Sequence, residues 1–115
     1  MYGENARVCI NKSTRESSGA TQTKFSQIKK PSDTVLIAEV DPNNANTTSP
    51  SQSNVTGYYA QGRHDGKGEL AMCDGSARSA RTNDFQRTQP EANSAAAEWS
   101  VERKIYWYPS PDTPN

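Results

Sequence analysis

The residues best suited to chemistry lie in one short stretch of the chain, residues 63–75. It contains the only histidine, His64, together with one of the two cysteines, Cys73, and the carboxylate of Asp74. An imidazole near a carboxylate could exchange protons or bind a metal, and a thiol beside a histidine could act as a nucleophile. The spacing of these three residues therefore decides whether the stretch is a reaction site or a structural unit.

The pattern around these residues predicts two tight turns joined by a strand. Asp65-Gly66 and Asp74-Gly75 are turn dipeptides, because aspartate tolerates a positive φ and glycine prefers one. Between them the residues Glu69–Cys73 alternate, with Leu70 and Met72 on one face, as a half-buried strand does.

This arrangement separates His64 from Asp74. With residues 65–68 as the hairpin loop, His64 lies opposite Glu69, and Asp74 is five strand residues further on, roughly 16 Å away at about 3.3 Å per residue. Cys73 lies at the same far end, so it cannot form a nucleophile–base pair with His64. We therefore interpret His64, Asp74 and Gly75 as structural: the imidazole bonds across the loop, to Glu69 or to backbone, and Asp74-Gly75 forms the next turn. The serines include no Gly-x-Ser-x-Gly turn, and we expect no enzymatic activity and no catalytic residue.

Calcium is the one cofactor that the acidic residues leave open. Asp65, Asp74, Asp84 and the run Asp41-Pro42-Asn43-Asn44 carry the oxygen ligands that calcium prefers. None of them has the spacing of a dedicated calcium loop such as the EF-hand, and turn-forming aspartate and asparagine need no metal to explain them. We expect no bound cofactor or metal, with a calcium site as the alternative.

The two cysteines, Cys9 and Cys73, allow two interpretations. A disulfide between them would close a loop of roughly 65 residues and stabilise the fold by about 4 kcal/mol, in the chain-entropy description. Alternatively, both are buried thiols that pack as small apolar groups. We favour the disulfide, because the apolar core is small.

The composition indicates a single domain, residues 1–115, with many loops. Only 31% of the 115 residues are apolar, and there are seven prolines and seven glycines. These features favour an α+β fold, with a small antiparallel sheet (a β-meander), short helical segments and long loops. Thirteen basic residues balance thirteen acidic ones without a basic stripe, so we expect no nucleic-acid partner. No run approaches the roughly 20 apolar residues of a membrane span, so we expect no membrane contact from this chain.

Hydrophobic periodicity and turn residues place the remaining elements. The stretch 35–40 is apolar on both faces and predicts a central strand. One helical turn is expected over 26–30 before Pro31, and a short helix over 91–98 after Pro90. The other expected strands are 1–10, 55–63, 69–73, 76–81 and 105–108. Long loops are expected over 11–23 and 41–54, and an irregular tail over 109–115; the loop 41–54 is a candidate interaction surface.

The aromatic residues Tyr106, Trp107 and Tyr108 are a second candidate interaction surface. On a strand they alternate between two faces, so some point outward, where tyrosine and tryptophan commonly form protein interfaces or stack on sugars. One interpretation of the chain is therefore a secreted ligand-binding module, with carbohydrate as its ligand.

Three segments carry a further signal in combination. They are Gln27–Glu39 (QIKKPSDTVLIAE), His64 followed by nine residues and Asp74-Gly75, and Ile105–Pro109 (IYWYP). Their content and order resemble a family of pseudopilin-like proteins with a His-x9-Asp-Gly signature. The family is known from planctomycete- and verrucomicrobia-type bacteria and is related to type II secretion pseudopilin G and type IV pilins.

This resemblance implies a non-enzymatic structural subunit that is periplasmic or extracellular, with a role in filament assembly or protein secretion. Its partners would be other pseudopilin or pilin subunits or a secreted cargo. Family members begin with a leader and a long apolar helix, which anchors the full-length form in the membrane. This chain shows neither, so we expect it to be the globular part.

Overall fold

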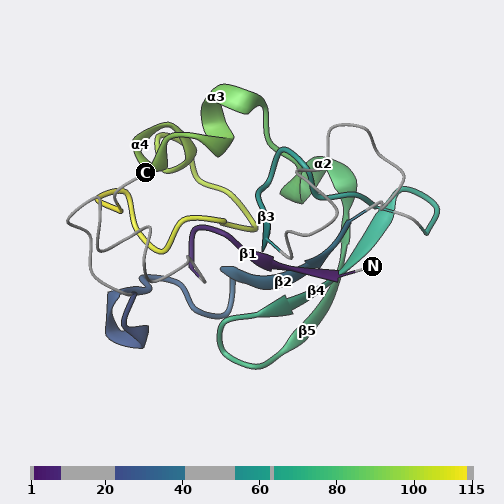
Figure 1. Ribbon diagram of the computed structural model, residues 1–115, viewed down its shortest axis with the longest axis horizontal. Helices are drawn as coiled ribbons and strands as arrows, with labels where there is room; N and C mark the ends of the chain where they lie inside the picture. Colours follow the sequence, from purple (N-terminus) through teal and green to yellow (C-terminus); the bar gives the residue numbers. More distant parts are fainter. Residues whose placement is uncertain (1, 9–22, 41–53, 63, 114–115) are drawn as a thin grey trace.

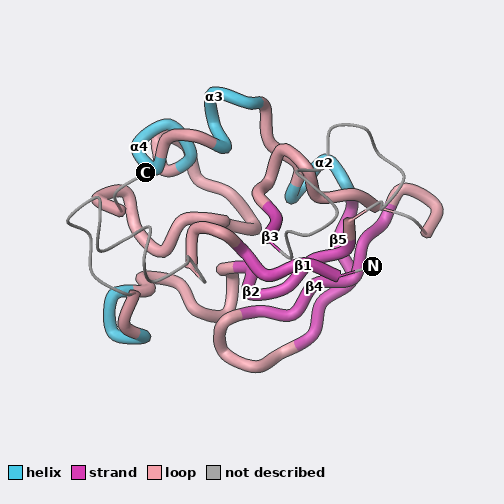
Figure 2. The backbone as a smooth tube through the Cα atoms, viewed as in Figure 1, coloured by secondary structure: helices cyan, strands magenta, loops and turns pink. Residues whose placement is uncertain are grey.

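The computed structural model describes residues 2–8, 23–40, 54–62 and 64–113. Its centre is a five-stranded sheet with the strand order β3-β1-β2-β4-β5 (Figures 1 and 2). The strands are β1 (Tyr2–Asn5), β2 (Val35–Glu39), β3 (Asn54–Val55), β4 (Lys67–Met72) and β5 (Ala77–Arg81). Short helices accompany this sheet, so the α+β class expected from the composition is confirmed.

Strand β2 is the middle strand of the sheet, as its apolar sequence predicts. It pairs antiparallel with β1 on one side and with β4 on the other, and its register to β4 shifts between Val35 and Ile37. Val35 and Ala38 are fully buried. None of the five residues of β2 is exposed, so both faces of the strand are covered, and a strand covered on both faces has a continuous apolar sequence.

The expected meander forms only in its last two strands. β4 and β5 make an antiparallel hairpin with Leu70 opposite Arg78. The prediction of a first meander strand over 55–63 is wrong, because β3 ends at Val55 and pairs parallel with β1. After β3 the chain turns and packs against the C-terminal region, where a Cβ at Gly57 would lie 2.8 Å from the Trp107 ring. β2 therefore takes the position beside β4.

The helices of the described residues are single turns. They are the 3-10 helix η1 (Phe25–Gln27) and the α-helices α2 (Thr82–Phe85), α3 (Gln89–Ala92) and α4 (Ala95–Glu98). The one helix expected over 91–98 is thus two turns, because Ser94 accepts from the N–H of Ala97 at 3.2 Å and starts a new helix there. None of the helices in the described part of the chain is long and apolar enough to cross a lipid bilayer.

Residues 105–108 do not form the expected last strand. Only Tyr106 bridges to the sheet, in the parallel sense, opposite Thr34. The N–H groups of Trp107 and Tyr108 donate to a side-chain carboxylate rather than to a neighbouring strand. A ladder cannot continue without those donors, so the segment stays irregular.

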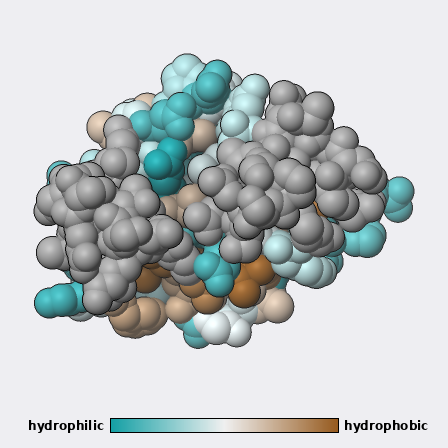
Figure 3. All heavy atoms as spheres, in the orientation of Figure 1, coloured by the Kyte–Doolittle hydropathy of each residue, from teal (hydrophilic) through white to brown (hydrophobic). Residues whose placement is uncertain are grey.

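The core lies between the sheet and the C-terminal region, whose helices and yellow C-terminal segment lie on one side of the strands in Figure 1. Leu70 and Met72 of β4 pack there with Phe85 of α2 and with Trp107. In the view of Figure 3, apolar residues gather along the lower margin near the sheet, and hydrophilic ones lie near α3 at the top. The expected loops over 11–23 and 41–54 fall almost wholly outside the described residues.

Candidate functional site

His64 lies at the start of a two-residue hairpin turn that leads into β4. Its N–H donates to Lys67 O at 3.0 Å, and its O accepts from the Lys67 N–H at 2.9 Å. The two residues between them, Asp65 and Gly66, have φ values of 51° and 73°. Positive φ at both central positions is typical of a type I′ turn, so Asp65-Gly66 forms a turn of the kind that its sequence predicts. The loop is shorter than expected, and His64 is opposite Lys67 rather than Glu69.

The side chain of His64 contacts the end of β2. Its Nε2 lies 3.2 Å from Oε1 of Glu39, and the imidazole is 67% exposed while the Glu39 side chain is 7% exposed. The other Glu39 oxygen accepts from the N–H of Glu69 at 3.2 Å. The expected bond across the loop therefore goes to a different partner: Glu39, from a distant part of the sequence, replaces Glu69.

Asp74 and Gly75 form the turn between β4 and β5. Oδ1 of Asp74 accepts from the Ser76 hydroxyl at 2.6 Å and from the Ser76 N–H at 2.9 Å, and these bonds lower the pKa of Asp74. Gly75 has a φ of 90°, which side chains rarely allow, and nothing lies within 4 Å of the position of a Cβ there. The turn is therefore fixed by aspartate capping and by the conformational freedom of glycine.

His64 and Asp74 lie at opposite ends of β4, one before Lys67 and the other after Met72. Asp65 is exposed in the first turn, and Asp84 lies in α2. Among the described residues no group of three or more histidine, cysteine, aspartate or glutamate side chains could hold a metal ion. The run 41–44, the other calcium candidate, lies outside those residues.

Cys73 follows β4, with its Sγ 3.7 Å from Val35 O. Cys9 lies outside the described residues, so the disulfide between Cys9 and Cys73 stays a prediction.

Tyr106, Trp107 and Tyr108 are interior residues, with exposed fractions of 2%, 1% and 0%. The prediction that they form an interaction surface is therefore wrong for this structure. It assumed a strand with one outward face, whereas the irregular segment turns all three rings inward. The ring of Tyr106 stacks on that of Trp99, with 4.0 Å between the ring centroids, and the ring N–H of Trp107 donates to Phe85 O at 2.6 Å. These rings cannot form a platform for sugars while the core is intact.

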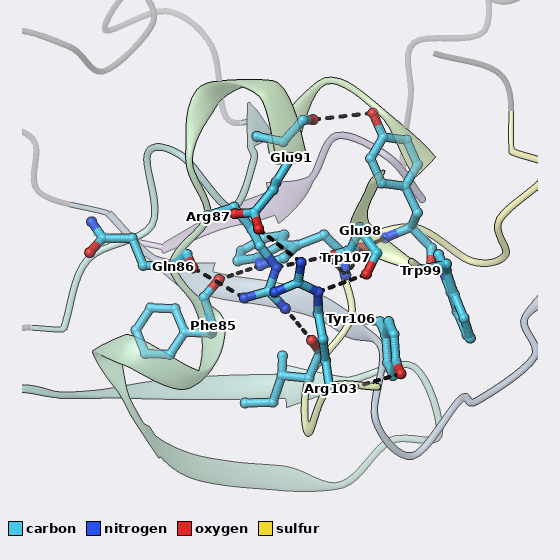
Figure 4. A network of polar contacts seen from close by, with 12 residues as sticks. Phe85, Gln86, Arg87, Glu91, Glu98, Trp99, Arg103, Tyr106 and Trp107 are labelled. Carbon is cyan, nitrogen blue, oxygen red and sulfur yellow. Dashed lines mark hydrogen bonds and ion pairs between the residues drawn. The ribbon is translucent and has the colours of Figure 1, made fainter. Parts of the chain in front are cut away.

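The most concentrated polar network was not predicted from the sequence, and it centres on Glu98 (Figure 4). This carboxylate is completely buried. It accepts from the N–H groups of Trp107 at 2.9 Å and Tyr108 at 2.7 Å, and from Nε of Arg87 at 3.1 Å. Burial raises the pKa of Glu98, and the donors and the Arg87 charge oppose that rise. One side chain thus binds the backbone of the irregular C-terminal segment.

Arg87 extends this network to three further carbonyl groups. It is 4% exposed, and its guanidinium donates to the O atoms of Asp84, Gln86 and Ile105. Burial lowers the pKa of Arg87, and Glu98 opposes this effect. The guanidinium stays charged, because its ordinary pKa is far above neutrality. Arg87 and Glu98 therefore form a buried ion pair in which nearly every donor and acceptor has a partner.

A second ion pair lies at the rim of this network. Nη2 of Arg103 lies 2.9 Å from Oε1 of Glu91, and Nε of Arg103 donates to Glu98 O at 2.7 Å. The hydrogen bonds from the Thr88 N–H, from Arg103 and from the Thr88 hydroxyl lower the pKa of Glu91 to about 2, and the charge of Arg103 adds to this effect. The sequence signal for Glu91 was present, since Thr88-x-x-Glu91 is the pattern of a capping box.

Comparisons of the chain with protein-family profiles, curated proteins and solved structures gave no match. The function of the site must therefore be inferred from its own geometry. The side chains of His64 and Asp74 and those of the Glu98 network are each engaged in a turn, a cap or an ion pair of the fold. The arrangement can hold strands and loops in register, and within the described residues it does not assemble a nucleophile, a base and an orienting group.

Proposed function

We propose that the chain is the globular domain of a non-enzymatic structural subunit, similar to pseudopilins and type IV pilins. The observation that supports this most is that the three segments carrying the resemblance bond to one another. Glu39 of the first segment bonds to His64 of the second, and the first also pairs with Tyr106 of the third. The signature residues thus meet in one structural unit.

The contacts between the first two segments are extensive. The N–H of Cys73 donates to Thr34 O at 2.8 Å, and the N–H of Asp74 donates to Pro31 O at 3.1 Å. The turn that contains Asp74-Gly75 is therefore held against the chain that precedes β2. These contacts explain the presence of the Asp74-Gly75 turn by its structural role, without any catalytic role, and this favours a structural subunit over an enzyme.

The third segment closes the unit from the other side. Val35 N–H donates to Tyr106 O at 2.9 Å, and Lys29 N–H donates to Pro109 O at 3.0 Å. A domain built in this way offers rigid surfaces to neighbouring subunits or to a secreted cargo. On this proposal it acts outside the cytoplasm, in the periplasm or at the cell exterior, and the full-length form is anchored in the membrane.

The test is to tag the full-length gene product at its C-terminus in the source bacterium and to shear filaments from the cells. We expect the tag in the sheared high-molecular-weight fraction and on filaments in immunogold electron microscopy. A strain with an inactive prepilin peptidase is the matched control and should lose both signals. A tag that behaves as a free monomer, with or without active peptidase, would contradict the proposal.

A further inference from the structure

Strand β5 is an end strand of the sheet, and half of its backbone groups point away from its neighbour. Met72 N–H donates to Ser76 O and Thr82 N–H donates to Gly66 O, both at 2.8 Å, on either side of the β4–β5 pairing. Antiparallel strands bond through alternate residues, so Arg78 and Ala80 face β4. The N–H groups of Ala77, Ser79 and Arg81 and the C=O groups of Ala77 and Ser79 therefore face the outer edge, whereas the C=O of Arg81 begins α2 as its N-cap. Within the described residues these outward groups of Ala77 and Ser79 and the Arg81 N–H form no backbone bond.

A shallow groove of about 320 Å³ lies along this edge, between β5 and the residues Lys104 and Ile105. Its wall is fixed by Arg78, which donates to Lys104 O at 3.2 Å and pairs with Asp33 at 2.9 Å. β5 is the last strand in the order of the sheet, and in Figure 1 its label lies below those of the other strands. The volume is at the small end for ligand sites, which suits one or two side chains of a longer molecule rather than a whole small ligand.

The groove is basic. Lys67, Arg81 and Lys104 line it together with Arg78, and Asp84 is the one acidic residue of the lining. Arg78 forms an ion pair with Asp33. Lys67, Arg81 and Lys104 form no ion pair within 4 Å with any carboxylate of the described residues. Three cations that no described carboxylate pairs with, beside three outward backbone donors, favour a ligand that is both extended and negatively charged.

We propose that the outer edge of β5 and this groove bind an extended acidic segment of a partner protein by strand addition. The partner backbone pairs with Ala77, Ser79 and the N–H of Arg81, and its carboxylates reach Lys67, Arg81 and Lys104. A second copy of the chain is a poorer occupant, because pairing two β5 strands would bring two basic grooves together. The inference does not depend on the proposed function, because the edge would act alike in a free domain and in a filament.

Charged residues on an edge strand also have a protective role, since they discourage unwanted pairing between sheets. That role alone predicts no binding to any strand. The two possibilities therefore differ in a measurable way, through a peptide that carries complementary charge.

The probe is a capped nine-residue peptide that alternates aspartate and valine, added to the full 115-residue chain labelled with ¹⁵N. Amide hydrogen exchange is measured by NMR. The amides of Ala77, Ser79 and Arg81 should exchange quickly in the free protein and become protected with the peptide, while Arg78 and Ala80 are protected throughout. The matched peptide with lysine for aspartate should protect none of the three outer amides. Absence of protection with the acidic peptide at millimolar concentration, or equal protection with both peptides, would overturn the proposal.

Three variants separate backbone pairing from charge. Arg81→Glu with Lys104→Glu should weaken binding of the acidic peptide by about tenfold or more, because attractions between exposed charges become repulsions. Lys29→Glu makes the same kind of charge change at an exposed position outside the groove and should leave the affinity unchanged. Ser79→Pro keeps the cations but removes the central outward N–H, which an edge strand tolerates, and it should abolish binding. Protection of Arg78 and Ala80 reports that each variant keeps the hairpin. Wild-type affinity in Ser79→Pro would show that strand addition is wrong.

Discussion

Replacing Glu98 with glutamine should destabilise this protein strongly, although the change alters a single functional group. Glu98 accepts four hydrogen bonds within 3.1 Å from Arg87 and from the backbone of Trp107 and Tyr108, and it has no exposed surface. Glutamine has nearly the same shape, but it is neutral and one of its two terminal atoms is a donor. The Glu98→Gln variant therefore leaves Arg87 charged, buried and without its counter-ion, and it points an amide N–H₂ at a backbone N–H.

The expected loss of unfolding free energy is about 3–5 kcal/mol, the range for breaking a buried ion pair from one side. For comparison, a chain of 115 residues has a total stability of roughly 6–17 kcal/mol. The substitution would thus remove a large part of the stability without removing any apolar surface. The destabilisation arises because the buried charge of Arg87 loses its counter-ion, so a second substitution that removes this charge should restore part of the stability.

The measurement is urea unfolding at neutral pH, followed by tryptophan fluorescence. Trp107 is a suitable reporter because it is buried and its N–H contacts Glu98. A double-mutant cycle with Arg87→Met and Glu98→Gln isolates the coupling between the two side chains, which we expect at about 2–3 kcal/mol. Glu102→Gln is the matched control, since Glu102 is exposed, and it should change the stability by less than about 0.5 kcal/mol.

Two outcomes would refute this reasoning. A loss below about 1 kcal/mol in Glu98→Gln would mean that Glu98 behaves like an exposed carboxylate, because surface ion pairs contribute that little. Additive effects of Arg87→Met and Glu98→Gln would mean that the two groups do not depend on each other.

Three further predictions concern other parts of the fold. The pKa of Glu91 is held at about 2, below its ordinary 4.5, so the ionised carboxylate contributes its full stabilisation above about pH 4.5 and loses it as the pH falls toward 2. In Glu91→Gln the free energy of unfolding should therefore depend less on pH over this range. Urea unfolding between pH 2.5 and 6 measures the difference. Gly75→Ala should lower the free energy of unfolding by about 1–2 kcal/mol, from the strain of a φ of 90° alone. Gly68→Ala should lower it by more, because the new Cβ would lie 2.8 Å from the Phe85 ring. Thermal unfolding of both variants shows which of them is less stable. His64→Ala should keep the fold and cost about 1 kcal/mol, since Glu39 retains the bond from Glu69 N–H; a loss above about 3 kcal/mol in urea unfolding would contradict this.

The parts of the fold that the sequence predicts are those in which a local rule and the tertiary structure agree. The continuous apolar run at 35–40 identifies the central strand, and the dipeptides Asp65-Gly66 and Asp74-Gly75 identify the two turns. Positive φ at Gly66 and Gly75 explains why these positions could be read from residue type alone. The β4–β5 hairpin follows, because two close turns leave the strand between them few alternatives.

The errors occur where a distant residue overrides the local pattern. Ile105–Tyr108 alternates like a strand, but Glu98 accepts the N–H groups that a ladder would use. The partner of His64 is likewise remote, since Glu39 is 25 residues away in the chain. No local rule specifies such contacts, and a single acidic residue after three alanines gives no warning that it is buried.

Buried polar groups explain how a chain with so little apolar content orders its irregular segments. Asn5 donates to Val35 O at 2.6 Å and to Trp107 O at 2.8 Å, so one amide joins β1, β2 and the C-terminal segment. The Glu98 carboxylate joins α4 to the same C-terminal segment and to Arg87, whose guanidinium donates to further backbone carbonyls. In a low-dielectric interior these bonds are strong while complete and costly once one member is lost. Isosteric polar changes at Asn5, Arg87 and Glu98 should therefore lower the free energy of unfolding more than the loss of a methyl group from the core does. In a protein held together mainly by an apolar core, the loss of core methyl groups would have the larger effect.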